Sequence, residues 1–243
     1  MEVFLLSSFA HCYLLIALLL YMSIGTKHES SLHRDLKFRY AGEGGETEAK
    51  VAGFVADGIN AKGEYFEVQT GSFGPLKKKA LALRRLKVIH PIILTKYIEV
   101  YNKRGKLQYR RKSPRRGQPW DLFNVLVYSP DLPLVPGLVI ELALVDAAEK
   151  RVQDGKGSWR RKGVSIRDRQ ILVFHDTITL KKLSDYNRFI PFKKKEKFTS
   201  ALLAQKAGIS VDLARKTLYV LTKIGIIVKT GKQGNSLVYV RKP

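Results

Sequence analysis

Residues 54–70 read FVADGINAKGEYFEVQT, and their pattern is that of a β-hairpin. Polar and apolar residues alternate through 54–60 and again through 64–70, as they do in strands with one buried face. The connection between the two runs ends in Gly63, and a three-residue hairpin loop with a bulge needs glycine at that position. The stretch therefore predicts two antiparallel strands.

The register of this hairpin opposes two carboxylates. If Asn60 faces Glu64 across the loop, then Asp57 lies directly opposite Glu67, and Gln69 follows on the same face as Glu67. Like charges at opposed positions are destabilising unless a cation lies between them. The arrangement therefore requires a divalent metal ion or a Lys or Arg neighbour.

Length and composition indicate a folded, strongly basic protein. The chain has 243 residues, 45% of them hydrophobic, and a net charge of +23. Such a charge favours polyanionic partners, with nucleic acid first and an anionic membrane surface second, although a merely basic surface has the same composition. The single cysteine, Cys12, excludes an internal disulfide and any cysteine-based zinc site.

The N-terminal residues 3–24 are apolar enough to cross a bilayer. A secretory signal is disfavoured because only Glu2, and no basic residue, precedes the apolar run. Two interpretations remain open: a membrane anchor that leaves the basic remainder in the cytoplasm, or an over-extended start with Met22 as the true first residue. The second interpretation is preferred, and it predicts a cytoplasmic protein.

The hairpin is flanked by elements of an α/β domain, predicted to span residues 27–112. A helix over residues 27–40 carries Glu29 at its start, where a first-turn acid by default serves the helix dipole. A first strand follows at 46–51. Beyond the hairpin, a helix over 75–86 carries Lys77 and Lys78 on its cationic outer side and leads into a strand over 87–94 that is parallel to the strand of Glu67. A second hairpin turns at residues 102–105.

Residues 113–180 are interpreted as a basic connecting region of mixed helix and strand. Its start contains Arg115 and Arg116 in a loop rich in proline and glycine, where phosphate contact and simple solvation explain the charges equally well. A short helix is predicted at 120–127 and a strand at 171–180, whereas the apolar run 138–145 fits either type.

Residues 181–243 have the layout of a winged helix-turn-helix. A short helix capped by Thr199 and stopped by Gly208 precedes a second helix over 211–223, and two strands with a basic, glycine-containing tip follow. In this layout the second helix enters the major groove of DNA and the wing contacts the backbone or minor groove. The predicted phosphate contacts are Arg215, Lys216, Lys223, Lys229 and Lys232.

From Glu29 to Leu94 the chain resembles the PD-(D/E)XK, or restriction-endonuclease-like, superfamily, in which a helix with a Glu, a hairpin with Asp and Glu-x-Lys, a helix and a parallel strand occur in this order. The resemblance implies a restriction-endonuclease-like mixed sheet with flanking helices. It also implies Glu29, Asp57 and Glu67 as Mg²⁺ ligands, and Gln69 with the backbone of Val68 as the water-orienting group. The chain departs from the motif at Gln69, which replaces lysine, and at Ala56, which replaces proline.

The whole arrangement also resembles a family of uncharacterised bacterial proteins with a terminal helix-turn-helix, from which no activity is carried over. The first hypothesis is a DNA-binding protein whose nuclease-like domain cleaves phosphodiesters with Mg²⁺. The alternatives are a non-catalytic DNA-binding or regulatory protein whose degenerate nuclease fold only recognises nucleic acid, and a membrane-tethered basic protein. The hairpin itself has a further interpretation, in which it is half-buried and its acids are solvated near Lys50 and Lys62.

Overall fold

A computed structural model describes residues 29–242 of the chain. The chain divides into two compact units, residues 1–30 and residues 31–243, and the account below concerns the second. The apolar segment 3–24, with its two interpretations, lies outside the described residues. In the described range, no helix is both long and apolar enough to cross a membrane.

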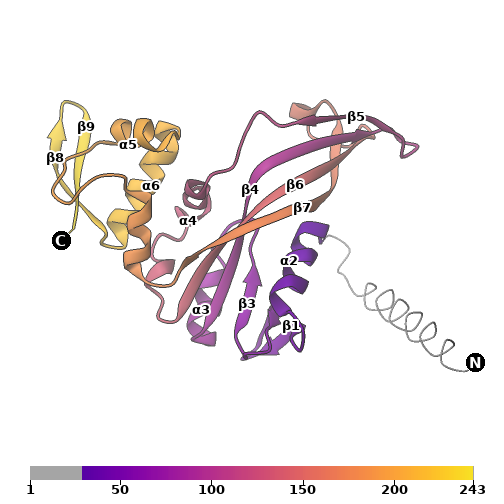
Figure 1. Cartoon of the computed structure of the whole chain (residues 1–243), viewed down its shortest axis with the longest axis horizontal. Coiled ribbons are helices and arrows are strands. Elements are labelled where there is room, and N and C mark those ends of the chain that lie inside the picture. Colours follow the sequence, from indigo (N-terminus) through magenta and orange to yellow (C-terminus); the bar gives the residue numbers. More distant parts are fainter. Residues whose placement is uncertain (1–28, 243) are drawn as a thin grey trace, which may run out of the picture. The chain divides into compact units, whose positions relative to one another are not determined.

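The second unit is built on a mixed seven-stranded sheet with the order β1-β2-β3-β4-β6-β7, in which β5 also pairs with β4 (Figure 1). The predicted α/β class is confirmed at this level. The strands are β1 (Glu46–Val51), β2 (Phe54–Ile59), β3 (Tyr65–Val68), β4 (Leu86–Tyr101), β5 (Leu107–Lys112), β6 (Leu138–Gln153) and β7 (Val164–Leu180).

The hairpin has the predicted register. Gly58 pairs with Phe66 and Ile59 with Tyr65 in antiparallel β2 and β3, and the loop closes with the N–H of Asn60 donating to the carbonyl of Glu64. Gly63 has a φ of 74°, which a side chain rarely tolerates. The next connection, through α3 (Leu76–Leu83), brings β4 parallel to β3, as predicted.

The connecting region extends the sheet. The run 138–145 is part of a strand, β6, which lies parallel to β4 over its whole length, and β7 is antiparallel to β6. The short helix predicted at 120–127 consists of η1 (Pro119–Leu122) and α4 (Phe123–Leu126). Residues 113–180 therefore belong to the same sheet as the hairpin. Two further 3-10 turns are η2 (Leu132–Leu134) and η3 (Trp159–Arg161).

Helices cover the two faces of the sheet. On one face, α2 (Ser31–Ala41) buries Leu32 and Leu36 against Phe66 and Ala143. These two leucines are one helical turn apart, which is why the segment forms a helix with a single apolar stripe. On the other face, α3 packs with η1, α4 and residues of the C-terminal region in the larger core.

The C-terminal region has the predicted order of two helices and two strands: α5 (Ser200–Ala207), α6 (Val211–Lys223), β8 (Ile227–Gln233) and β9 (Ser236–Arg241). A 3-10 helix that was not predicted, η4 (Leu183–Phe189), precedes them. Thr199 Oγ1 accepts the N–H of Leu202 at 3.3 Å, and Ser210 caps α6 in the same way at 3.2 Å. Leu126 of α4 and Leu218 of α6 lie in one hydrophobic cluster, so the region shares its core with the sheet.

Candidate functional site

The two acids of the hairpin lie where β2 and β3 separate. Backbone pairing ends at Gly58 and Phe66, and beyond it Asp57 Oδ2 accepts the N–H of Val68 at 2.8 Å. The N–H of Asp57 donates to Glu67 Oε2 at 3.3 Å. Each carboxylate thus accepts a hydrogen bond from a backbone N–H of the opposite strand, in the place of a backbone carbonyl. The side chains of Asp57 and Glu67 are 19% and 16% exposed.

A cation next to this pair comes from α3. Lys79 Nζ lies 2.5 Å from Glu67 Oε2 and also donates to the carbonyl of Val55. On the other side, His33 of α2 lies with Nε2 3.0 Å from Asp57 Oδ2. The predicted need for a Lys or Arg neighbour is therefore met by Lys79. In the described chain, neither Lys50 nor Lys62 forms an ion pair with these acids.

The two carboxyls differ in their pKa. Burial raises the pKa of Glu67, the nearby charge of Asp57 raises it further, and Lys79 offsets only part of this, so it stays above its ordinary value of 4.5. Burial also disfavours the charged form of Asp57, but the hydrogen bonds from His33 and Val68 and the charges of His33 and Lys37 outweigh it and lower its pKa. Asp57 is consequently the more readily ionised of the pair.

The other two predicted site residues are Gln69 and Glu29. The amide of Gln69 donates to the carbonyl of Ser72 in its own loop, and its backbone oxygen lies 2.7 Å from Nδ1 of buried His90. Glu29 precedes α2 and belongs to the N-terminal unit. Its role as a ligand stays a prediction.

The donor chemistry of the acid pair suits a divalent cation. Within residues 29–242, Asp57 Oδ1 and Glu67 Oε1 accept no hydrogen bond, and neither is a fully buried oxygen. The same part of the chain contains no group of three or more His, Cys, Asp or Glu side chains that could hold a metal. Mg²⁺ is commonly held by one or two carboxylates together with substrate phosphates, so the donor types of this pair are those that such an ion takes.

The basic residues predicted on the sheet domain differ in how they are paired. Lys77 forms an ion pair with Asp131, and Arg115 lies 3.4 Å from an oxygen of Asp121. Lys78 and Arg116 are exposed. Only the latter two present an uncompensated charge to a partner.

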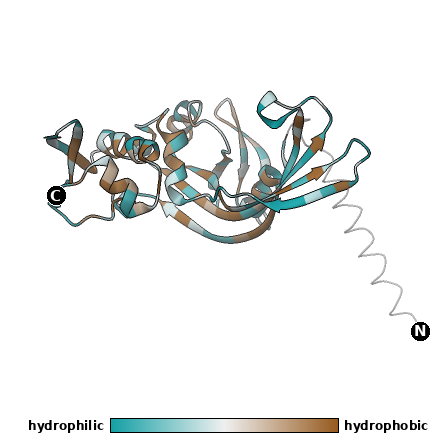
Figure 2. Ribbon diagram, turned by 90° about the horizontal axis from the view of Figure 1, so that it is seen from above, coloured by the Kyte–Doolittle hydropathy of each residue, from teal (hydrophilic) through white to brown (hydrophobic). Residues whose placement is uncertain are grey.

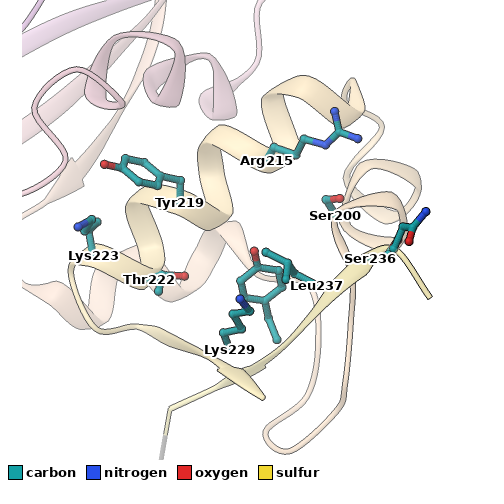
Figure 3. Close-up of a pocket in the computed structure, with 10 residues that line it drawn as sticks. Ser200, Arg215, Tyr219, Thr222, Lys223, Lys229, Ser236 and Leu237 are labelled. Carbon is teal, nitrogen blue, oxygen red and sulfur yellow. The ribbon is translucent and has the colours of Figure 1, made fainter. Parts of the chain in front are cut away.

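The second candidate site is an open pocket of about 410 Å³ between α6 and the β8–β9 hairpin (Figure 3). Arg215, Tyr219 and Lys223 project from the exposed side of α6, one turn apart. Lys229 of β8 and Leu237 of β9 line the opposite side. Among the described residues, three cations and no carboxylate line this pocket, so its potential favours an anion.

The structure separates two neighbours that were predicted together. Arg215 faces the pocket, whereas Lys216 points to α4, with its Nζ 3.1 Å from Asn124 Oδ1 and 2.7 Å from an oxygen of Asp212. Lys216 thus serves the packing of α6 on α4. Lys232 is exposed on β8.

Sequence reasoning missed Lys79, His33 and Tyr219 as site residues. For Lys79 a signal existed: it lies between Leu76 and Leu83 next to buried Ala80, so helical periodicity places it beside the packed stripe rather than facing outward like Lys78. His33 had no such signal because its partner, Asp57, lies 24 residues away.

Comparison with known proteins places the sheet domain in a family. A model described as "Domain of unknown function (DUF8091)" matches residues 30–181, which is more than half of the chain. The chain belongs to this family. The DUF8091 region spans α2 to the end of β7, so it contains the acid pair and excludes α6.

One relative of this DUF8091 protein extends beyond the family region. An "Uncharacterized protein" of Treponema pallidum (strain Nichols) is 28% identical over 225 residues, which cover 91% of this chain and 89% of the relative. The likeness therefore also includes most of the C-terminal region. No solved structure matches the chain.

Proposed function

We propose that this protein binds DNA through its C-terminal region, used as a winged helix. The observation that carries the proposal is the pocket between α6 and the β8–β9 hairpin, where Arg215, Lys223 and Lys229 gather and no carboxylate is among the described residues that line it. Helix α6 has 13 residues, a length of roughly 20 Å, and its exposed side is polar, so it is suited to the major groove. The hairpin then lies along the adjacent backbone.

Binding of duplex DNA to the full chain, measured by fluorescence anisotropy over a range of salt concentrations, tests this proposal. Arg215→Gln is expected to weaken binding and to reduce the slope of log affinity against log salt by about 1, because one phosphate contact is lost. Lys216→Gln is the matched control: it removes the same charge from the next position of α6, where the ammonium binds Asn124.

The two variants give opposite results if the proposal is right. Lys216→Gln leaves the salt slope unchanged and lowers only thermal stability. An Arg215→Gln protein that binds with wild-type affinity and slope would show that α6 does not contact DNA, and the pocket would then serve another anionic partner.

A second candidate function is Mg²⁺-dependent cleavage of phosphodiester bonds in a restriction-endonuclease-like sheet. One specific observation favours it: the ammonium of Lys79 lies 2.5 Å from Glu67 Oε2. A lysine is therefore present beside the acids, although Gln69 stands at the position where the motif has lysine. Asp57 Oδ1 and Glu67 Oε1 would hold the ion. Bound there, Mg²⁺ would polarise a phosphate and lower the pKa of a coordinated water.

The remaining roles in this candidate belong to protein side chains. Lys79 holds Glu67 and places a positive charge where phosphate oxygens become more negative. His33 fixes the orientation of Asp57 through its 3.0 Å contact. Gln69, turned to Ser72, orients its own loop rather than the acids.

Binding of Mn²⁺, followed by calorimetry and by electron paramagnetic resonance, tests the site independently of activity. Asp57→Asn is expected to abolish ion binding and cleavage while leaving DNA affinity intact, because Asp57 lies outside the α6 pocket. DNA binding by the wild type without cleavage under Mg²⁺ or Mn²⁺ would instead identify a non-catalytic DNA-binding protein with a degenerate nuclease fold.

A further inference from the structure

Two loops meet at one end of the sheet. Strands β4 and β6 are parallel up to the pairing of Tyr101 with Val152, so the loops that follow them, residues 102–106 and 154–163, lie at the same end (Figure 1). The first loop turns into β5 and the second into β7. Neither loop contributes to the α6 pocket or to the acid pair.

These loops and the strand ends beside them carry much of the positive charge. Residues 96–112 and 149–169 together contain fifteen Lys and Arg and four Asp and Glu, a net charge of +11 against +23 for the whole chain. Strand β5 is exposed along its entire length, and Figure 2 shows hydrophilic segments alternating with hydrophobic ones along the strands of the sheet. Repulsion of this size is unfavourable in a free protein and is relieved by a polyanion.

A groove of about 530 Å³ lies between the two loops. Lys103 and Tyr109 line it from the β4–β5 side, and Arg151, Arg161 and Lys162 line it from the β6–β7 side. No carboxylate lines this groove among the described residues, in contrast to the polar pocket beside Arg115, which includes Asp121 and Asp212. Among the described residues, the charged side chains that line the groove are therefore all cations.

Two of the four cations that line the groove, Arg151 and Arg161, are held by hydrogen bonds within the protein. Buried Glu149 accepts two hydrogen bonds from Arg151, at 2.8 and 2.6 Å, which aim this guanidinium. Arg161 Nε donates to the carbonyl of Val164 at 3.1 Å. The loop itself is closely packed, since a Cβ on Gly157 would lie 1.9 Å from that same oxygen.

Aromatic rings accompany the cations. Trp159 is 83% exposed and occupies the same short turn, η3, as Arg161, and Tyr109 is 48% exposed in the groove wall. Exposed aromatic rings beside a cationic groove suit unpaired bases, which stack on them while the backbone follows the charges. In a duplex the faces of the bases are already stacked on one another, so these rings favour a single strand.

We propose that the groove between residues 102–109 and 151–164 binds single-stranded nucleic acid, with phosphates at Lys103, Arg161 and Lys162 and bases stacked on Tyr109 and Trp159. The proposal is independent of duplex binding by α6, because the two surfaces share no residue. A chain with both surfaces would contact DNA or RNA at two separate places.

Anisotropy of a labelled oligo(dT) of about 15 nucleotides, with the full chain and EDTA, tests this site. Lys103→Gln with Lys162→Gln is expected to reduce affinity about tenfold or more, and Trp159→Ala with Tyr109→Ala to reduce it similarly with little change in salt slope. The matched control, Lys194→Gln with Lys195→Gln, removes the same charge from exposed positions elsewhere and leaves affinity unchanged.

Two further measurements test the groove. Arg215→Gln should keep full affinity for oligo(dT), which separates this site from the α6 surface. Acrylamide quenching of Trp159, with Trp159→Ala as the blank, should decrease when oligo(dT) binds. The proposal is overturned if the groove variants bind oligo(dT) as the wild type does, or if anionic phosphatidylserine vesicles protect Trp159 and oligo(dT) does not.

Discussion

At the scale of single residues, the acid pair depends on one lysine. Lys79 and Glu67 have side chains only 12% and 16% exposed, so their charges are poorly screened and each needs the other. The neighbouring carboxylate, Asp57, adds a second negative charge that raises the pKa of Glu67. The same lysine is both a structural partner and, in the nuclease candidate, a phosphate ligand.

Lys79→Met is expected to lower the free energy of unfolding by about 2 kcal/mol, because two close carboxylates are left without their cation. This value lies between the cost of losing an exposed ion pair and the cost of breaking a fully buried one. Urea unfolding followed by circular dichroism measures this. Lys78→Met is the control on the same helix: Lys78 is exposed, so its loss should change stability little. Equal effects of the two substitutions would contradict a special role for Lys79.

The stability difference between wild type and Asp57→Asn should depend on pH. The pKa of Asp57 is lowered from 3.8, so its ionised form stabilises the fold above that value, and the contribution is lost as the pH falls through the folded-state pKa. The difference should therefore be constant above about pH 5 and shrink in urea titrations as the pH falls to 3.8 and below.

Glu67→Gln should show the opposite trend. The pKa of Glu67 is raised from 4.5, so its carboxyl favours the folded state below that value and loses this contribution as the pH rises through the folded-state pKa. Parallel pH profiles for the two variants would contradict the assignment of Asp57 as the more acidic group.

At the scale of elements, α6 combines a buried side with an exposed cationic side. Leu213, Leu218 and Leu221 face the core, whereas Arg215, Tyr219 and Lys223 face solvent. Ser210 satisfies an N–H at the start of the helix, next to the turn that joins it to α5. This cap fixes where the helix begins and so positions its exposed residues.

Ser210→Ala is expected to cost about 1 kcal/mol of stability, because the N–H of Leu213 loses its side-chain acceptor. The melting temperature reports this loss. Ser210→Asp retains an acceptor at the same position and should restore stability to near the wild-type value. A variant with alanine that melts like the wild type would show that the cap is dispensable.

At the scale of the whole second unit, the sheet domain and the C-terminal region share one hydrophobic core. Fully buried Phe123 of α4 contacts Phe189 edge-on, with 4.8 Å between the ring centroids, and both belong to the cluster that includes Leu218 of α6. The DUF8091 match ends at residue 181, before Phe189. The family boundary therefore does not coincide with a boundary of packing.

Phe123→Ala is expected to lower the free energy of unfolding by about 3–5 kcal/mol, as the loss of a large buried ring does. Because the core is shared, the sheet and the C-terminal helices should unfold together in the variant and in the wild type. Hydrogen exchange of β6 and α6 amides measures this. Separate transitions for these two elements would show that the C-terminal region folds independently.

The sequence by itself determined the local elements. Alternation and Gly63 predicted the hairpin and its register, and the caps and glycines of residues 199–225 predicted the helix pair, because strand pairing across a short loop and helix capping involve residues close in sequence. It also placed Asp57 beside Glu67. The nuclease and winged-helix interpretations built on these elements stay proposals.

Only the tertiary structure decided which groups neutralise the acids and where the basic residues point. Lys79 of α3 contacts Glu67, and His33 of α2 contacts Asp57. Lys216 of α6 donates a hydrogen bond to Asn124, and residues 138–153 form a strand that pairs with β4. Each of these depends on how helices and strands pack, and packing is set by burial summed over the whole core rather than by any short stretch of residues.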